Sequence, residues 1–233
     1  MAKYSSYVAA LDAIIERVSS NLPVCGQSAS NKLHFEIQRL RTAVNALHTL
    51  NSARSPTETE AAHIKKVSLA AKRLGAEVAT ARTRVSETTR LGLLEIDERI
   101  AQKIDLRPNG YAAEIRAAFR NLDYVKQISL LDELASSNRG PELAAIIKAP
   151  TLLTGIDPDL VSKFTELVIQ KHAPAEFQEQ FDLMEVMNSA LTAVSVGETV
   201  AGEFLDPVVL AKIEAGESAA NEAEVAFTNS LPA

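Results

Sequence analysis

The sequence contains no tryptophan and a single cysteine, and only 5% of its residues are aromatic. A lone cysteine, Cys25, excludes a disulfide within the chain. Scarce aromatic residues disfavour a β-sandwich, because strands are enriched in aromatic and β-branched side chains. No stretch has the apolar length needed to cross a bilayer, and the first residues lack the apolar segment of a signal peptide. We therefore expect a cytoplasmic protein with no membrane partner.

Apolar residues are abundant, at 46% of the chain, and they recur at the spacing of a helix face. A first helix is predicted to end at Pro23, because proline cannot continue a helix, and residues 26–30 are predicted to form a loop. Steps of four and three predict two apolar stripes in this region. The stripes are Tyr4, Val8, Leu11, Ile15, Val18 and Leu22, then Leu33, Ile37, Leu40, Val44 and Leu47.

A third helix is predicted to be unusually long. The segment Ser55-Pro56-Thr57-Glu58 matches a capping box, in which Ser and Glu satisfy free backbone N–H groups at a helix start. No further proline occurs before Pro108, so a single helix of about 50 residues, about 75 Å long, is predicted. The apolar face of this helix, which we call its seam, begins with coiled-coil spacing and then takes two successive steps of four residues. This shift predicts that the helix changes its packing partner partway along its length. The seam comprises Ile64, Val67, Ala71, Leu74, Val78, Ala81, Val85, Thr89, Leu93, Ile96, Ile100 and Ile104.

The predicted fold class is all-α. The short connection at residues 51–55 predicts an antiparallel hairpin of the second and third helices, which the first helix completes to a three-helix bundle. The distal half of the long helix is expected to bury its apolar residues against shorter C-terminal helices. Those residues are Leu91, Leu94, Ile96, Ile100 and Ile104.

The C-terminal region is predicted to consist of shorter helices, four of which start near a proline. Proline suits the first turn of a helix, where its missing N–H has no partner to lose. The four prolines are Pro141, Pro158, Pro174 and Pro207. We expect two domains, an N-terminal helical bundle of residues 1–107 and an acidic multi-helix region of residues 108–233.

Charge is distributed unevenly along the chain. The net charge is −6, but residues 32–107 carry 14 basic and 9 acidic side chains, whereas residues 108–233 carry 8 basic and 19 acidic ones. Opposite charge in the two regions favours docking of the acidic region on the basic region of a neighbouring copy. The alternative is that both sets of charges only keep the protein in solution.

Motifs that would carry chemistry are incomplete. Residues 197–202 have the glycine spacing of a phosphate-binding loop, but Glu203 and Phe204 follow where lysine is required, and a helix break is the alternative. His34, His48 and His63 lack the further ligands that a metal site needs. Cys25 has no base at a fixed spacing. We expect a non-enzymatic protein with no catalytic residue, no cofactor and no metal.

Basic residues of the predicted long helix form the candidate interaction surface. They could follow a phosphate backbone without regard to sequence, although interleaved acids favour a solvated face with ion pairs along the helix. A soluble adaptor or regulatory module that binds a protein partner or nucleic acid through this basic ridge is therefore an alternative function. The ridge comprises Lys65, Lys66, Lys72, Arg73, Arg82, Arg84, Arg90 and Arg99.

One segment resembles a known class of proteins. Residues 140–156, GPELAAIIKAPTLLTGI, followed by a helix that closes with Lys171-His172-Ala173-Pro174, resemble small, acidic, alanine-rich helical proteins from the structural gene modules of tailed bacteriophages and prophages. The resemblance implies a virion component or assembly factor, internal or associated with the connector or tail. Such a protein would form oligomers, contact other structural proteins, and be found in the virion or host cytoplasm.

Overall fold

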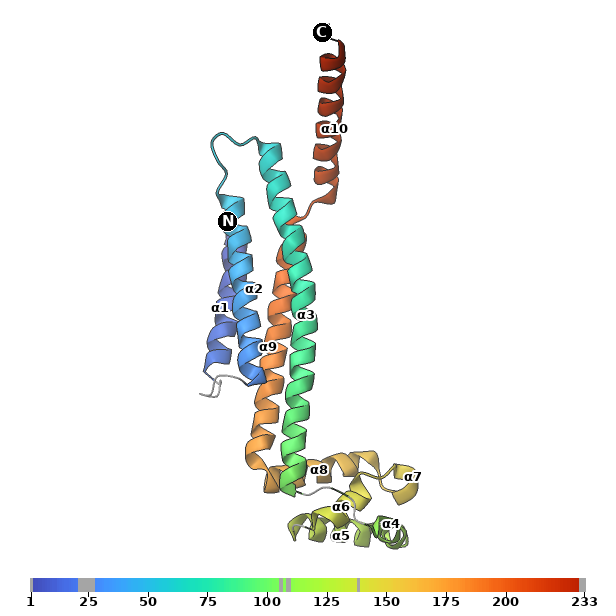
Figure 1. Ribbon diagram of the computed structural model, residues 1–233. Helices are drawn as coiled ribbons and strands as arrows, with labels where there is room; N and C mark the ends of the chain where they lie inside the picture. Colours follow the sequence, from blue (N-terminus) through green and yellow to red (C-terminus); the bar gives the residue numbers. More distant parts are fainter. Residues whose placement is uncertain (1, 21–27, 105–106, 108–109, 138, 231–233) are drawn as a thin grey trace. The chain divides into compact units, whose positions relative to one another are not determined.

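The computed structural model describes residues 2–20, 28–104, 107, 110–137 and 139–230 (Figure 1). Within these residues the chain forms α-helices and no β-strand, which confirms the predicted all-α class. Cys25 and Pro23 lie outside the described residues. The helices are α1 (Ala2–Ser19), α2 (Ala29–Ser52), α3 (Glu60–Ile104), α4 (Ala112–Arg120), α5 (Tyr124–Ser136), α6 (Gly140–Ile147), α7 (Thr151–Thr154), α8 (Pro158–His172), α9 (Pro174–Phe204) and α10 (Pro207–Ser230).

The chain divides into two compact units. The first unit contains residues 1–89 and 185–233, and the second contains residues 90–184. These bounds differ from the predicted domains 1–107 and 108–233, because the last part of α9 packs with the N-terminal helices. In the first unit, the Arg17 side chain of α1 donates a hydrogen bond of 3.1 Å to Ser189 Oγ of α9.

The core of the first unit is built from the predicted apolar stripes. All five stripe residues of α2, from Leu33 to Leu47, are buried. In α1, Leu11 and Val18 are buried as predicted, but Ile14 is buried where Ile15 was expected. Figure 1 shows α2 and α3 side by side, and ion pairs such as Arg84 to Glu36 join them. The apolar spacing therefore identified the inner faces of these helices.

Helix α3 confirms the prediction of one long uninterrupted helix, with 45 residues in place of about 50. Its buried positions take two successive steps of four at Ala81, Val85 and Thr89, close to the predicted shift, but Leu93, the next predicted position, is only half-buried. The Thr89 hydroxyl donates to the Val85 carbonyl oxygen at 2.9 Å, which satisfies this buried polar group. Ile96, Ile100 and Ile104 are buried as predicted, but burial of Leu91 and Leu94 was wrong, because both are 47% exposed.

The predicted capping box at Ser55 does not start α3. Residues 56–58 form a turn, and Thr59 caps the helix through its Oγ1, which accepts a hydrogen bond of 3.3 Å from the Ala62 N–H. Glu58 instead pairs with His63, at 3.3 Å, and with Lys66. The same carboxylate also accepts a hydrogen bond from the Ser55 backbone, so part of the capping-box pairing is present although the helix itself begins at Glu60.

The four predicted proline starts are confirmed. Helices α8, α9 and α10 begin at Pro158, Pro174 and Pro207, and α6 carries Pro141 in its first turn. Asp157 caps α8 by accepting a hydrogen bond from the Asp159 N–H at 3.0 Å. The loop predicted at residues 26–30 is wrong for Ala29 and Ser30, which belong to α2 with Ser28 as its cap, and residues 26–27 lie outside the described residues.

Helices α4 to α8 belong to the second unit, and their core centres on fully buried Phe119 of α4. Leu131 of α5, Leu143 and Ile146 of α6, and Val168 of α8 are also buried. The ring of His172, at the end of α8, lies 2.8 Å from the Ala135 carbonyl oxygen of α5. This unit therefore has a core of its own.

Candidate interaction surface

The basic residues of the candidate ridge all lie on α3, and most are engaged by carboxylates of the same chain. Five of the eight form ion pairs, which leaves fewer free charges than the sequence suggested. Lys72 and Arg73 are exposed, and Arg90 interacts with another group of the same chain. The five pairs are Lys65 with Glu217, Lys66 with Glu58, Arg82 with Glu198, Arg84 with Glu36 and Glu77, and Arg99 with Glu179.

The ridge is not one continuous surface. Arg82 pairs with Glu198 of α9, whereas Arg84 pairs with Glu36 of α2. Residues two apart are about 200° apart around a helix, so these arginines point to opposite sides of α3. Each arginine therefore joins α3 to a different neighbouring helix.

Arg84 holds the most enclosed of these charge clusters. It donates two hydrogen bonds of 2.9 Å to the Glu36 carboxylate and one of 2.6 Å to Glu77. Arg39 also pairs with Glu77, at 3.1 Å. The hydrogen bonds from Arg84 to Glu36, and then to Glu77, raise the pKa of the Arg84 guanidinium. The Glu36 side chain is only 13% exposed, so Arg84 is the partner that satisfies its carboxylate oxygens.

Replacing Arg84 with methionine is expected to lower the free energy of unfolding by about 1–3 kcal/mol, because Glu36 would lose the charged group that satisfies it. Arg82→Met is the matched control. Its pair with Glu198 has both side chains about half exposed, so a loss of roughly 0–1 kcal/mol is expected. Urea unfolding of both variants measures the difference. Equal losses would show that Arg84 is not a structural residue.

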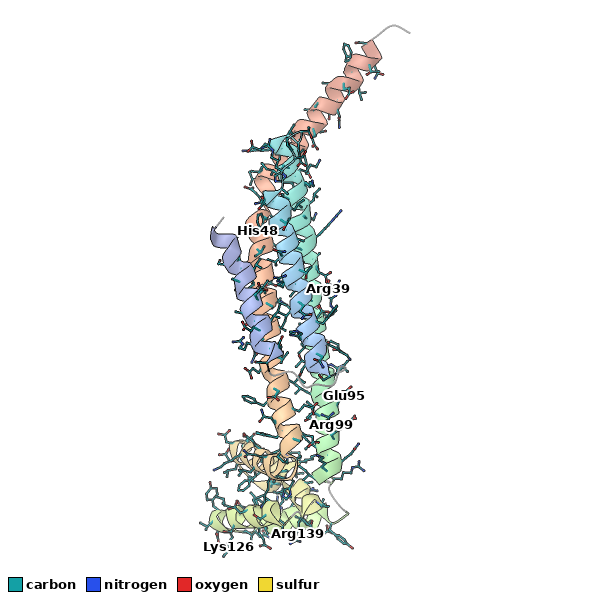
Figure 2. The ribbon with its side chains drawn as sticks, turned by 90° about the vertical axis from the view of Figure 1, so that its left-hand side faces the viewer. Arg39, His48, Glu95, Arg99, Lys126 and Arg139 are labelled. Carbon is teal, nitrogen blue, oxygen red and sulfur yellow. The ribbon has the colours of Figure 1, made fainter. Side chains whose placement is uncertain are left out.

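The C-terminal part of α3 makes similar contacts with the beginning of α9. Arg99, labelled in Figure 2, pairs with Glu179, and Lys103 pairs with Glu176 at 2.7 Å. The Glu176 side chain is only 10% exposed, whereas that of Glu179 is 43% exposed. The hydrogen bond from Lys103 is the main reason that the pKa of Glu176 lies below its usual value of 4.5.

This lowered pKa predicts an acid-sensitive contribution to stability. The stabilisation from Glu176 is present above about pH 4.5 and is lost as the pH falls through the lower pKa of the folded state. Glu176→Gln is expected to reduce stability by roughly 0.5–1 kcal/mol at pH 7 and to flatten the acid limb of the stability profile. Urea unfolding at several pH values, with Glu179→Gln as control, measures this. A variant profile parallel to that of the wild type would contradict the assignment.

The histidines do not converge on a common site. His63 Nδ1 lies 3.3 Å from Glu58, and its Nε2 lies 3.1 Å from the Asn51 carbonyl oxygen. His34 Nε2 lies 2.8 Å from the Gln38 amide nitrogen. Among the described side chains, no group of three or more His, Cys, Asp or Glu residues is arranged to hold a metal ion.

The glycines of the apparent phosphate loop lie inside α9, which runs without interruption from Pro174 to Phe204. Their backbone N–H groups are therefore part of a helix rather than a loop that could surround a phosphate. The alternative expectation of a helix break was also wrong. Gly197 is a contact point, because a Cβ atom there would lie 2.8 Å from a Val78 methyl group.

Helix α10 presents a surface that its own chain leaves open. None of its 24 residues is buried, and every position from Glu214 to Ser230 is exposed. Phe227 is 65% exposed and Val225 is 59% exposed. The sequence analysis predicted where this helix begins but did not identify an interaction surface on it.

A second open surface lies between α2 and α3. Two adjoining hollows share Leu50, Ala70 and Arg73 and together form what we call the α2–α3 groove. Its charged lining is mixed, with Lys65, Lys66 and Arg73 beside Glu77 and Glu217, the last from α10. The apolar lining residues are Ala43, Ala46, Leu47, Leu50, Ala62, Leu69, Ala70 and Leu74.

None of the helices in the described part of the chain combines the length and apolar character needed to span a membrane. Comparison of the chain with protein-family models, curated proteins and solved structures finds no significant match.

Proposed function

We propose that the chain is a non-enzymatic structural or assembly protein that acts through helix-mediated contacts with copies of itself and with other structural proteins. The observation that carries the proposal is that α10 has no buried residue and is exposed at every position from Glu214 to Ser230. An isolated helix of this length is marginal in water, because most helices gain their stability from packing an apolar face. A partner that covers α10 would supply this packing.

The proposal places the protein in a tailed-phage particle, as an internal, connector-associated or tail-associated component found in the virion or host cytoplasm. Support comes from the resemblance of residues 140–156 and from the contrast between basic and acidic regions. The scaffold in this proposal is an antiparallel hairpin of α2 and α3 within a helical bundle. The same helices then offer surfaces to neighbouring copies.

Particle association tests this role directly. Particles from the native source would be purified on a density gradient, and the chain would be quantified by mass spectrometry across the fractions. A fixed copy number that follows the particle peak is expected. A chain that stays at the top of the gradient would contradict a role in the virion, and electron microscopy of partly assembled particles would then test an assembly role.

The alternative, a nucleic-acid adaptor, receives less support from the geometry. Arg82 and Arg84 point to opposite sides of α3, and both already pair with carboxylates of this chain. Salt-dependent retention on DNA, with a slope that falls when Lys65 and Lys66 are neutralised, would favour the adaptor over the structural role.

A further inference from the structure

A further hollow lies on α2 and α3, which run side by side (Figure 1), and it shares no residue with the α2–α3 groove. We call it the Phe35 hollow, because Phe35 lines it and is 62% exposed. Its volume is about 740 Å³, which leaves room for further side chains beside the ring. Helix α2 contributes Asn31, Lys32, Phe35 and Glu36 to the lining, and α3 contributes Thr83, Arg84, Glu87 and Thr88.

Phe35 points away from the core of its own chain. Leu33 and Ile37 belong to the buried stripe of α2, and a residue two positions away lies about 200° around the helix. The core that buries this stripe therefore cannot also bury the Phe35 ring. A single exposed apolar side chain is ordinary on a protein surface, but this one is aromatic and borders a hollow. Aromatic side chains in such positions are typical anchors of protein contacts.

The charges of the Phe35 hollow are of both signs. Arg84 and Glu36 pair with each other through two hydrogen bonds of 2.9 Å and so neutralise one another. Lys32 of α2 is exposed and forms no ion pair with any residue that the structure describes. Glu87 of α3 is also exposed and interacts within its own chain, and a carboxylate has about four acceptor sites, so it can accept a further donor. The hollow thus has a basic edge on α2 and an acidic edge on α3.

A second copy of the same surface matches these edges in one orientation. A two-fold axis parallel to the helices places α2 of each copy against α3 of the other, so Lys32 of one copy faces Glu87 of the other, twice in the dimer. The same arrangement places each Phe35 ring over Thr83 and Thr88 of the second copy. A two-fold axis across the helices would instead place α2 against α2 and Lys32 against Lys32, which like charges disfavour.

We infer that the Phe35 hollow is the contact of a two-fold symmetric dimer, in which Phe35 of each copy enters the hollow of the other. This inference rests on the proposed structural role and names one of its contact surfaces. The interface is isologous, because both copies use the same surface, and it closes with two copies. Helix α10 contributes no residue to the Phe35 hollow, so its exposed surface stays available to another structural protein.

Phe35→Ala tests the aromatic anchor, and Phe181→Ala is the matched control. Phe181 of α9 is also 62% exposed and does not line the Phe35 hollow. Sedimentation velocity of the full chain over a wide concentration range measures the dimer. Wild type and Phe181→Ala are expected to dimerise equally, and Phe35→Ala at least about tenfold more weakly. Circular dichroism checks that helix content is unchanged.

Charge reversal tests the orientation of the two copies. Lys32→Glu and Glu87→Lys each place like charges together at both contacts of the dimer, so each variant is expected to dimerise about threefold more weakly or worse at low salt. Mixing the two variants restores opposite charges at both contacts. With one variant fluorescently labelled, the heterodimer is therefore expected to exceed either homodimer, and high salt is expected to remove this preference.

The outcomes distinguish the inference from the proposed function. Dimerisation that Phe35→Ala leaves unchanged overturns the hollow as the contact but leaves a structural role in place. A mixture without an excess of heterodimer overturns the pairing of Lys32 with Glu87. A wild type that is monomeric at every concentration overturns the inference, and the particle fractionation described above then decides the structural role alone. If Phe35→Ala nevertheless removes such a monomer from the particle peak, another structural protein occupies the hollow.

Discussion

Phe119→Ala is expected to lower the free energy of unfolding by about 3–5 kcal/mol. Phe119 is the largest of the fully buried side chains, and its ring lies in the core that α4 contributes to the second unit. Removal of the ring loses the transfer free energy of the buried carbons and leaves a cavity that the surrounding helices fill only in part. Most single domains have a stability of only about 5–15 kcal/mol, so this change is severe.

Tyr124→Ala is the control for this prediction. It removes an aromatic ring from the start of α5, but Tyr124 is 61% exposed, so a change within about 0.5 kcal/mol is expected. Chemical denaturation followed by circular dichroism measures both variants. Similar losses for Phe119→Ala and Tyr124→Ala would contradict the core assigned to the second unit.

Replacement of Gly197 by alanine is expected to lower the stability of the protein, although the same replacement usually stabilises a helix. Alanine normally stabilises a helix relative to glycine by about 0.5–1 kcal/mol. At Gly197 the added Cβ would lie 2.8 Å from Val78 Cγ2, and valine is stiff at χ1 in a helix. Overpacking of this kind costs about 1–3 kcal/mol, so Gly197→Ala is expected to destabilise, and Gly197→Leu to destabilise by about 3 kcal/mol or more.

Gly202 is the matched control, because it lies five residues further along the same helix. No atom lies within 4 Å of the position that its Cβ would occupy, so Gly202→Ala is expected to stabilise by about 0.5–1 kcal/mol. Thermal unfolding of both variants gives the two signs. A stabilising Gly197→Ala would show that α9 does not approach α3 as closely as described.

Local sequence patterns predicted where the helices lie better than they predicted which helices pack together. The steps of four and three identified the buried face of α2, and the absence of proline predicted the continuity of α3. The return of α9 to the first unit was not predicted, because the contact of Gly197 with Val78 joins positions far apart in the sequence. A glycine interpreted as a loop signal instead lies where α9 and α3 pack closely.

A second capping residue explains the misplaced start of α3. Ser55 and Glu58 match the capping-box pattern and the Ser55 backbone does bind the Glu58 carboxylate, but Thr59 provides the cap at the start of the helix. All these candidate capping residues occur within a few positions of one another, and only their geometry distinguishes them.

The candidate surface was predicted in part. The sequence correctly placed the basic residues on a helix, but their ion pairs depend on long-range packing. The exposed surface of α10 was not predicted, because Gly216, Ala220 and Ala223 have too little apolar surface to stand out among neighbouring alanines.

The absence of buried residues in α10 gives the chain an intrinsic reporter of binding. Backbone amides in a helix that buries so little of its surface open readily, so their hydrogen exchange is expected to be fast. Lys212, the sole basic residue between Pro207 and Ser230, likewise offers trypsin one cleavage point in this helix. Slower deuterium uptake and resistance to trypsin at Lys212 would therefore report occupancy of α10 by any partner, without a label or a substitution.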